Sequence, residues 1–335
     1  MRNRIKIAIA GYGNLGKGVE KAVKESPDME LVGVFTRRDP ERVKLCTQGV
    51  DVLPADLLRE PGRLARKPDV LIICGGSAKD LPWQSPMYAR HYNIVDSFDN
   101  HVGIYEHFKG VDTVAKSAGT TAIIGAGWDP GLFSYNRAMS ECVMAKGRTY
   151  TFWGKGISQG HSDAIRSIEG VIDARQYTIP NEGLLEKIKT GEALAGLSTG
   201  SVPELSAEKR HERECFVVIE KGADEEGIRN AIINMPDYFA GYKTEVNFIS
   251  EEELETKHDK MPHGGTVIRK NKDAAYEFSL KLNSNPEFTA SVLTAYARAA
   301  YRISAEGGSG CRTILDVPLT YISLISHEEM IKNFL

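Results

Sequence analysis

Hydrophobic and polar positions in the first 125 residues follow two alternating patterns. Short, continuous apolar runs are separated by segments in which apolar positions recur with helical spacing. Such runs are typical of strands covered on both faces, as in a parallel sheet with helices on either side. The alternation therefore predicts an α/β fold that begins with a doubly wound parallel sheet. The expected strands lie at 5–10, 31–35, 70–74, 93–96 and 121–125. One helix is expected to start near residue 40, and two others are expected at 86–91 and 104–118.

The pattern changes after about residue 130, where shorter segments alternate partly between apolar and polar positions. Partial alternation is typical of strands with one face in the core and the other in solvent. Helical spacing intervenes at 163–171 and 182–189, so we expect a second, α+β domain with a mainly antiparallel sheet. The expected strands of that domain lie at 149–153, 176–179, 213–220, 242–249 and 266–269.

The first apolar run leads directly into a glycine-rich turn, GYGNLG at 11–16. In a Rossmann-type sheet, the first glycine of G-x-G-x-x-G permits the turn, the second admits a pyrophosphate, and the third lets the helix pack on the strand. The phosphates then bind free N–H groups at the helix N-terminus. Because strand, turn and helical pattern occur here in this order, the motif predicts a dinucleotide site.

The second strand ends in Thr36-Arg37-Arg38, where an NAD enzyme usually carries an acidic residue for the ribose 2′-hydroxyl. A pair of guanidinium groups suits the 2′-phosphate of NADP instead, because the planar fork matches phosphate oxygens. The sequence therefore predicts NADP as the cofactor. The alternative is that these arginines only form a solvated loop end.

Composition narrows the functional classes. The chain has 335 residues, of which 41% are hydrophobic, so it is long enough for two domains with sizeable cores. A net charge of −3 gives no support for a nucleic-acid partner. No apolar run approaches the roughly 20 residues that span a bilayer, so no membrane partner is expected. The five cysteines are scattered without metal-ligand spacing, so we expect no metal, and reduced thiols in a cytoplasmic protein.

Ligands bind doubly wound sheets at the carboxyl ends of the strands. Those ends carry Gly75-Gly76-Ser77, Asp99-Asn100 and Trp128-Asp129. We expect Asp99 and Asp129 to approach the same crevice, where two carboxylates could bind a substrate ammonium or stabilise an iminium. The alternative for each is turn chemistry, since aspartate caps helices and Asp-Pro-Gly forms tight turns.

The second domain offers weaker signals. Ser162 or Asp163 is expected to cap a helix, and Gly160 then places free N–H groups near its start, which is a ready carboxylate site. His263 is expected in an exposed loop, beside two glycines that permit close approach to a ligand, although a lone histidine is more often structural or solvated. The charged run at 209–213 is expected to be a solvated approach to a strand.

Longer motifs are more specific than the glycine turn. They are DSFDNH at 96–101, GWDPGLFSYNR at 127–137, SQGHSDA at 158–164, MPDYF at 235–239 and MPHGG at 261–265. With these segments the chain resembles the meso-diaminopimelate dehydrogenase family along essentially its full length. The resemblance implies a reversible, NADP-dependent oxidative deamination of meso-2,6-diaminopimelate at its D-centre. The products would be ammonia and L-2-amino-6-oxopimelate, which cyclises to tetrahydrodipicolinate in lysine biosynthesis.

The resemblance also implies a homodimer and gives the domains their roles. We expect a dinucleotide-binding domain at 1–126 and a substrate-binding and dimerisation domain at 127–286. An alanine-rich helix around 287–306 is expected to return to the first domain, followed by a C-terminal segment at 307–335.

Roles for individual residues follow from the same resemblance. Asp99 and Asp129 would be catalytic and lie beside the reacting D-amino group. The substrate would be held by walls at Trp128 and Trp153, by Gln159 and Gly160 at the D-centre carboxylate, by Thr178, Arg213 and His263 at the far carboxylate, and by Asn285 near the far amino group. The cofactor would be bound at the strand ends by Gly11, Tyr12, Gly13, Asn14, Leu15, Thr36, Arg37, Arg38, Gly75, Gly76, Ser77, Asp99 and Asn100.

Two other classes stay open from the residues alone. One is another NADP-dependent reductase, of the glucose–fructose oxidoreductase type, which relies on a Glu-Lys-Pro sequence after a strand. The only Lys-Pro here, Lys67-Pro68, precedes a strand instead. The other is a non-catalytic NADP-binding regulator, which would need no anchors for a second ligand.

Overall fold

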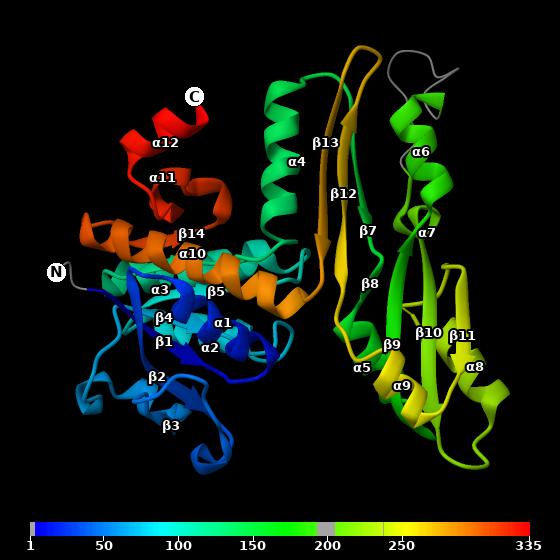
Figure 1. Cartoon of the computed structure of the whole chain (residues 1–335), viewed down its shortest axis with the longest axis horizontal. Helices are drawn as coiled ribbons and strands as arrows, with labels where there is room; N and C mark the ends of the chain where they lie inside the picture. Colours follow the sequence, from blue (N-terminus) through cyan, green and yellow to red (C-terminus); the bar gives the residue numbers. More distant parts are fainter. Residues whose placement is uncertain (1–3, 193–204, 237) are drawn as a thin grey trace. The chain divides into compact units, whose positions relative to one another are not determined.

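The structure is a computed structural model that describes residues 4–192, 205–236 and 238–335 (Figure 1). The chain divides into two compact units, of which the first comprises Met1–Tyr135 and Pro286–Leu335 and the second Asn136–Asn285. The sequence placed this boundary earlier, at residue 126, and treated 307–335 as a separate segment. In the structure, that segment belongs to the first unit.

The first unit is built on a parallel sheet of seven strands. Its order, β14-β6-β5-β4-β1-β2-β3, places β1 between β4 and β2, as in doubly wound dinucleotide-binding folds. The predicted Rossmann-type sheet is therefore confirmed, and β3 and β14 extend it beyond the predicted strands. The strands are β1 (Ile5–Ala10), β2 (Met29–Thr36), β3 (Val52–Pro54), β4 (Val70–Ile73), β5 (Asn93–Asp96), β6 (Thr121–Ile123) and β14 (Gly310–Arg312).

Helices cover both faces of this sheet, because alternate residues of β1 point into two separate cores. Ile7 and Ile9 pack in one cluster with α1 and α10, whereas Ala8 and Ala10 pack in another with α2 and α3. Burial on both faces explains the continuous apolar runs. The helices are α1 (Asn14–Glu25), α2 (Leu81–Ala89), α3 (Ile104–Ala118) and α10 (Asn285–Ala305), with α11 (Leu319–Ile322) and α12 (His327–Phe334) after β14, and α4 (Leu132–Val143) crosses into the second unit.

Helix α10 packs on the sheet of the first unit although it lies far from that sheet in sequence. Ala290 and Leu293 are buried in the same cluster as Ile7. Arg298, also buried, donates hydrogen bonds of 2.5 and 2.8 Å to the two carboxylate oxygens of Asp28. Apolar packing and a paired charge thus join the two ends of the chain.

The helix expected near residue 40 is wrong. Among the described residues between β2 and β3, only a 3₁₀ turn, Pro40–Arg42, is helical. The segment is held instead by Glu20 of α1, which is buried. One of its carboxylate oxygens accepts a hydrogen bond from Thr47 N at 2.6 Å, and the other accepts from the Tyr12 hydroxyl. A long-range contact replaces the local hydrogen bonds of a helix.

The second unit contains two sheets, with orders β11-β10-β9-β8 and β13-β12-β7. Among the strands that the structure describes, β10 and β11 run parallel and the other pairs are antiparallel. The predicted α+β domain is therefore confirmed. The strands are β7 (Arg148–Trp153), β8 (Gly156–Ile157), β9 (Val171–Pro180), β10 (His211–Ile219), β11 (Thr244–Phe248), β12 (His263–Lys270) and β13 (Ala275–Leu282). The helices are α5 (Gln159–Arg166), α6 (Glu182–Thr190), α7 (Ala207–Arg210), α8 (Glu225–Ile233) and α9 (Glu251–Lys257).

Two local predictions for this unit are wrong. Helix α5 begins at residue 159 and is capped by Ser158, not by a residue at 162 or 163. His263 is the first residue of β12 rather than part of a loop. The two glycines after it are required by the sheet, because a Cβ on Gly264 or Gly265 would lie 2.1 or 2.2 Å from a carbonyl oxygen of a neighbouring strand.

Candidate active site

The glycine turn after β1 leaves space for a ligand. Gly11 has φ +96°, and a Cβ on Gly16 would lie 2.3 Å from the Gly11 carbonyl oxygen, so helix and strand approach closely. At Gly13, by contrast, no described atom beyond its chain neighbours lies within 4 Å of a Cβ position. Helix α1 begins one residue later at Asn14 and has no side-chain cap, which leaves N–H groups for a phosphate.

Two other residues of this turn contribute their side chains to the core instead. Tyr12 is buried, and its hydroxyl donates to the Glu20 carboxylate. Burial and this carboxylate raise the pKa of Tyr12, so the hydroxyl stays protonated. Leu15 packs against the cluster around Ile7. The backbone is therefore what Tyr12 and Leu15 can offer a cofactor.

The two predicted phosphate-binding arginines are held by neighbouring groups. Arg37 donates from both terminal nitrogens to the two carboxylate oxygens of Asp80, at 2.8 and 3.0 Å, and still leaves its side chain 63% exposed. Asp80 also accepts from Gly76 N at 2.9 Å. The Arg38 guanidinium donates to the carbonyl oxygen of Tyr12. A fixed, solvent-facing guanidinium pair therefore lies beside the glycine turn, and sequence reasoning missed Asp80, which fixes half of it.

The neighbouring residues that the sequence assigned to the cofactor also make structural contacts. The buried Thr36 hydroxyl accepts from the backbone N–H two residues on, at 3.0 Å. A Cβ on Gly75 would lie 2.3 Å from Gln84 Oε1 and 2.8 Å from Asp80 Cβ, so a larger residue there would displace these side chains. Ser77 Oγ accepts from Asp99 N at 2.8 Å and so ties the end of β4 to the end of β5.

The two predicted catalytic carboxylates lie on the loops after β5 and β6. Asp99 is exposed, whereas Asp129 is half-buried and precedes a cis-proline. Asn100 uses its side-chain oxygen to accept from the N–H groups of Val102 and Gly103, at 3.1 and 3.0 Å. Asn100 thus stabilises the turn before α3, whose N-cap residue is Gly103 and which has no side-chain cap.

The loop after β6 is a tight turn that buries its tryptophan. Trp128 is 8% exposed and meets the Phe133 ring edge to face, with centroids 5.2 Å apart. A Cβ on Gly131 would lie 1.6 Å from the Gly127 carbonyl oxygen, so the turn closes only with glycine there. This fixes the backbone on both sides of Asp129.

One buried carboxylate, Asp96 at the end of β5, anchors both of these loops. Its Oδ1 accepts from Phe98 N at 3.0 Å and from Gly125 N at 3.1 Å, which lie on the first and second loop. Its Oδ2 accepts from Ser85 Oγ at 2.5 Å and contacts His107 Nε2 at 2.9 Å. The side chain is fully buried, so these partners supply all the solvation that the structure gives it. From sequence, Asp96 looks like the last residue of a strand, and its role was missed.

In the second unit, a buried histidine orients the predicted wall residue Trp153. His211 Nε2 accepts from Trp153 N at 2.8 Å, and Nδ1 donates to the Ala207 carbonyl oxygen at 3.0 Å. The two rings stack with centroids 5.0 Å apart. Burial lowers the pKa of His211 to about 4, so the ring is neutral at pH 7 and keeps its acceptor. From the sequence alone, no role was expected for this histidine.

Arg213 is buried rather than solvated, which corrects the expectation for the charged run. Alternation along β10 turns it inward, where it is 8% exposed. Its Nη1 donates to Thr178 Oγ1 at 2.5 Å, and its guanidinium lies 4.1 Å from the Tyr242 ring centroid. Burial lowers the pKa of Arg213, and no acidic side chain in the described ranges forms an ion pair with it. A buried cation without a counter-ion is suited to an anionic ligand.

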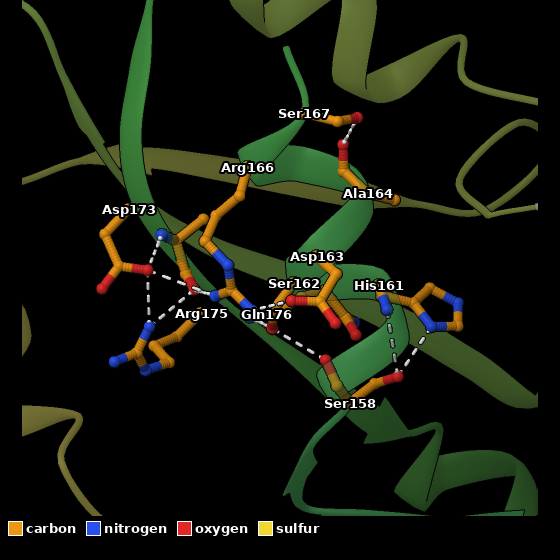
Figure 2. A network of polar contacts seen from close by, with 11 residues as sticks. Ser158, His161, Ser162, Asp163, Ala164, Arg166, Ser167, Asp173, Arg175 and Gln176 are labelled. Atoms are coloured by element: carbon orange, nitrogen blue, oxygen red, sulfur yellow. Dashed lines mark hydrogen bonds and ion pairs between the residues drawn. The ribbon is translucent and has the colours of Figure 1, made fainter. Parts of the chain in front are cut away.

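The start of α5 lies close to Arg213. Ser158 Oγ caps the helix and contacts His161 Nδ1 at 2.7 Å (Figure 2). Burial, together with the charge of Arg213, lowers the pKa of His161 to about 4. Gly160 is exposed, and apart from its chain neighbours and the backbone of its own helix no described atom lies within 4 Å of its Cβ position. The helix start is therefore open there, and the side chain of Gln159 lies outside the described part of the structure.

The two remaining predicted residues, His263 and Asn285, are each the first residue of an element, β12 and α10. His263 is half-buried at the start of β12, and its Nδ1 accepts from Gly264 N at 2.8 Å. Its ring packs on Gly156, where a Cβ would lie 2.4 Å from the ring. Asn285 begins α10, and its backbone N donates to the Met261 carbonyl oxygen at 3.0 Å.

The described residues contain neither a metal-binding cluster nor a membrane-spanning helix. Within the described residues, no group of three or more His, Cys, Asp or Glu side chains is arranged to hold a metal ion. No helix in the same residues has the length and apolarity needed to cross a membrane.

A Rossmann-type sheet with an open glycine turn, joined to an α+β unit with a buried cation, is the architecture of a dinucleotide-dependent oxidoreductase. The model of the diaminopimelic acid dehydrogenase C-terminal domain matches residues 127–284. The chain is 51% identical to the meso-diaminopimelate D-dehydrogenase of Acetivibrio thermocellus, over 99% of this chain and 98% of that protein. It is 45% identical to that of Corynebacterium glutamicum, over 93% of each. The chain therefore belongs to the meso-diaminopimelate D-dehydrogenase family.

Solved structures support the same relationship. The C. glutamicum DAP dehydrogenase in complex with DAP has a TM-score of 0.89 and 42% identity, and covers 99% of this chain and 100% of that one. An engineered D-amino acid dehydrogenase bound to NADP⁺ has a TM-score of 0.85 and 41% identity with the same coverage. The predicted fold class and family are thus confirmed, and the close relatives are enzymes rather than regulators.

Replacing Asp96 with Asn should destabilise the protein and slow the reaction. An amide offers one acceptor oxygen and turns an N–H group towards existing donors, so we expect a loss of about 2–4 kcal/mol of unfolding free energy. Chemical denaturation measures it, with Asp69→Asn as the control, because the Asp69 side chain accepts one hydrogen bond, from Lys6 N, at the amino ends of the strands. Equal losses in the two variants would mean that Asp96 is no special anchor.

Replacing Arg37 and Arg38 together with Ala should raise the Michaelis constant for NADP about tenfold or more, because charged hydrogen bonds to the 2′-phosphate are lost. The constant for NAD should change little. Arg42→Ala is the matched control, since Arg42 belongs to the same connection and its side chain is 88% exposed. Steady-state kinetics with both cofactors decide, and equal effects on NAD and NADP would leave the arginines without this role.

Proposed function

We propose that this chain catalyses the reversible, NADP-dependent oxidative deamination of meso-2,6-diaminopimelate at its D-centre. The amino acid, NADP⁺ and water give L-2-amino-6-oxopimelate, ammonium, NADPH and a proton. The ketone then cyclises to tetrahydrodipicolinate, and the reaction serves lysine biosynthesis. The observation that carries the proposal is the buried Arg213 guanidinium beside Thr178, in a chain of this family.

The first unit would hold the cofactor. The open backbone at Gly13 and the uncapped start of α1 suit the pyrophosphate, while Arg37 and Arg38 suit the 2′-phosphate. The backbone of Gly75 and Gly76 would line the same carboxyl ends of the strands, with Gly76 N held by Asp80. When bound, NADP accepts a hydride from the D-carbon of the substrate.

The substrate carries two carboxylates and two ammonium groups, so a selective site needs partners of both signs. Arg213, Thr178 and His263 would hold the far carboxylate, and Asn285 would lie near the far amino group. The backbone N–H groups of Gln159 and of the exposed Gly160, at the start of α5, would hold the D-centre carboxylate. Fixing both ends presents only one of two similar carbons for reaction.

The aromatic and acidic residues would act at the reacting carbon. Trp128 and Trp153 would wall the pocket, and both have fixed orientations, the first through Phe133 and the second through His211. Asp99 and Asp129 would stabilise the positive charge that develops on the amino group as the hydride leaves. Carboxylates held on anchored loops do this without reorganising during the reaction.

The wild-type protein should increase absorbance at 340 nm when mixed with meso-diaminopimelate and NADP at alkaline pH. Asp129→Asn should lower kcat by on the order of a hundredfold, because it removes a charge aimed at the transition state. Asp224→Asn is the control, since Asp224 only caps α8. If Asp129 acts only in its turn, both variants will lose some stability and keep kcat. NADP binding without any absorbance change would indicate a non-catalytic regulator.

The working state is proposed to be a homodimer in the cytoplasm. The homodimer rests on the family resemblance, and the compartment is supported by five cysteines that are all free thiols. Equilibrium sedimentation should give twice the chain mass of 36.9 kDa. A single species at the chain mass, with full activity, would contradict the dimer.

A further inference from the structure

A buried amide in β9 has unused hydrogen-bonding capacity. The side chain of Gln176 is 0% exposed, and neither its Nε2 nor its Oε1 has a hydrogen-bond partner among the described residues. Its backbone, in contrast, is satisfied: N donates to Ser162 Oγ and the carbonyl accepts from Ser158 N, both at 3.0 Å (Figure 2). Leaving a buried amide unpaired is unfavourable, so a folded protein rarely keeps one without a use.

The register of the sheet places this amide beside the predicted carboxylate site. Gln176 lies opposite Cys215, and Thr178 lies opposite Arg213. Since side chains alternate along a strand, Gln176 and Thr178 share a face, and the diagonal neighbour Arg213 is within reach of a long side chain. The helix start at Ser158, which borders the other predicted carboxylate site, is hydrogen-bonded to the Gln176 backbone.

Arg213 has unused capacity at the same place. Its Nη1 is bonded to Thr178 and one face of its guanidinium is covered by Tyr242, but its buried Nε has no partner within the described residues. Two donors, Gln176 Nε2 and Arg213 Nε, and one acceptor, Gln176 Oε1, are therefore buried in one neighbourhood. An amino-acid head group offers the complement, because its carboxylate accepts hydrogen bonds and its ammonium donates them.

We propose that Gln176 is a further substrate-binding residue, which recognises the far amino-acid head group of the substrate. Its Nε2 donates to the carboxylate that Arg213 and Thr178 bind, and its Oε1 accepts from the adjacent ammonium group. The inference rests on the proposed function, since it takes Arg213 as the far-carboxylate anchor. It adds a reason why a substrate with a second α-amino acid group is preferred: only such a group satisfies both ends of the amide.

Gln176→Met tests this role, because methionine has a similar length and no strong hydrogen-bonding atoms. We expect the Michaelis constant for meso-diaminopimelate to rise about tenfold or more, with kcat changed much less. Stability to denaturant should stay the same or increase, since an unpaired buried amide is removed. A purely structural glutamine would give the opposite result, a loss of stability with an unchanged Michaelis constant.

Tyr150→Phe is the matched control, because the Tyr150 hydroxyl is also buried without a described partner in the same unit but lies outside the proposed site. It should leave the Michaelis constant unchanged.

Gln176→Glu supplies a second variant, in which a carboxylate faces the substrate carboxylate and should weaken binding further. Unchanged constants in both Gln176 variants would overturn the inference. If the wild-type protein did not oxidise meso-diaminopimelate, the proposed function itself would fail, which is a separate outcome.

Discussion

The negative charge of Asp96 lies at the end of β5, where bulk water does not solvate it. A carboxylate in such a place is stable only when hydrogen-bond donors surround it, and every donor it uses becomes fixed. Here the donors include backbone N–H groups from the loops after both β5 and β6. The positions of Asp99 and Asp129 therefore depend on an electrostatic requirement at a residue that need not touch the substrate. Ser85 and His107 connect this requirement to helices α2 and α3.

Buried charged side chains in the two units differ in how completely the protein supplies their hydrogen-bond partners. Asp96 accepts hydrogen bonds at both of its carboxylate oxygens, and Arg298 is paired with the carboxylate of Asp28. Arg213 is buried to a similar extent but is only partly satisfied, by Thr178 and Tyr242. Asp96 and Arg298, whose charges have partners in the protein, stabilise the fold. Arg213, which is only partly hydrogen-bonded, can bind an anionic ligand. By the same reasoning, His211 has a structural role, because its ring is neutral and both of its ring nitrogens are hydrogen-bonded.

The parts of the fold that follow from local sequence could be predicted. Apolar runs gave the central strands because both of their faces are covered, and the glycine turn has a local steric cause. Asp80, Asp96 and His211 escaped prediction because their roles arise from partners far away in the chain. Arg213 was wrongly expected to be solvated, since a run of charged residues suggests a surface. The alternation of side chains along β10 turns this residue of the run into the interior. Its binding role came from family resemblance rather than from the run itself.

The interleaved construction of the first unit has a consequence for how the chain is made. One face of its sheet is covered by α1 and α10 together, so it stays partly uncovered until α10 has been synthesised, and the strand β14 follows later still. The second unit, in contrast, is encoded by one continuous stretch. During translation, the internal unit can therefore complete its core before the N-terminal one does, which reverses the usual order of folding from the ribosome. The first unit can complete its core only after the segment that carries α10 and β14 has been synthesised.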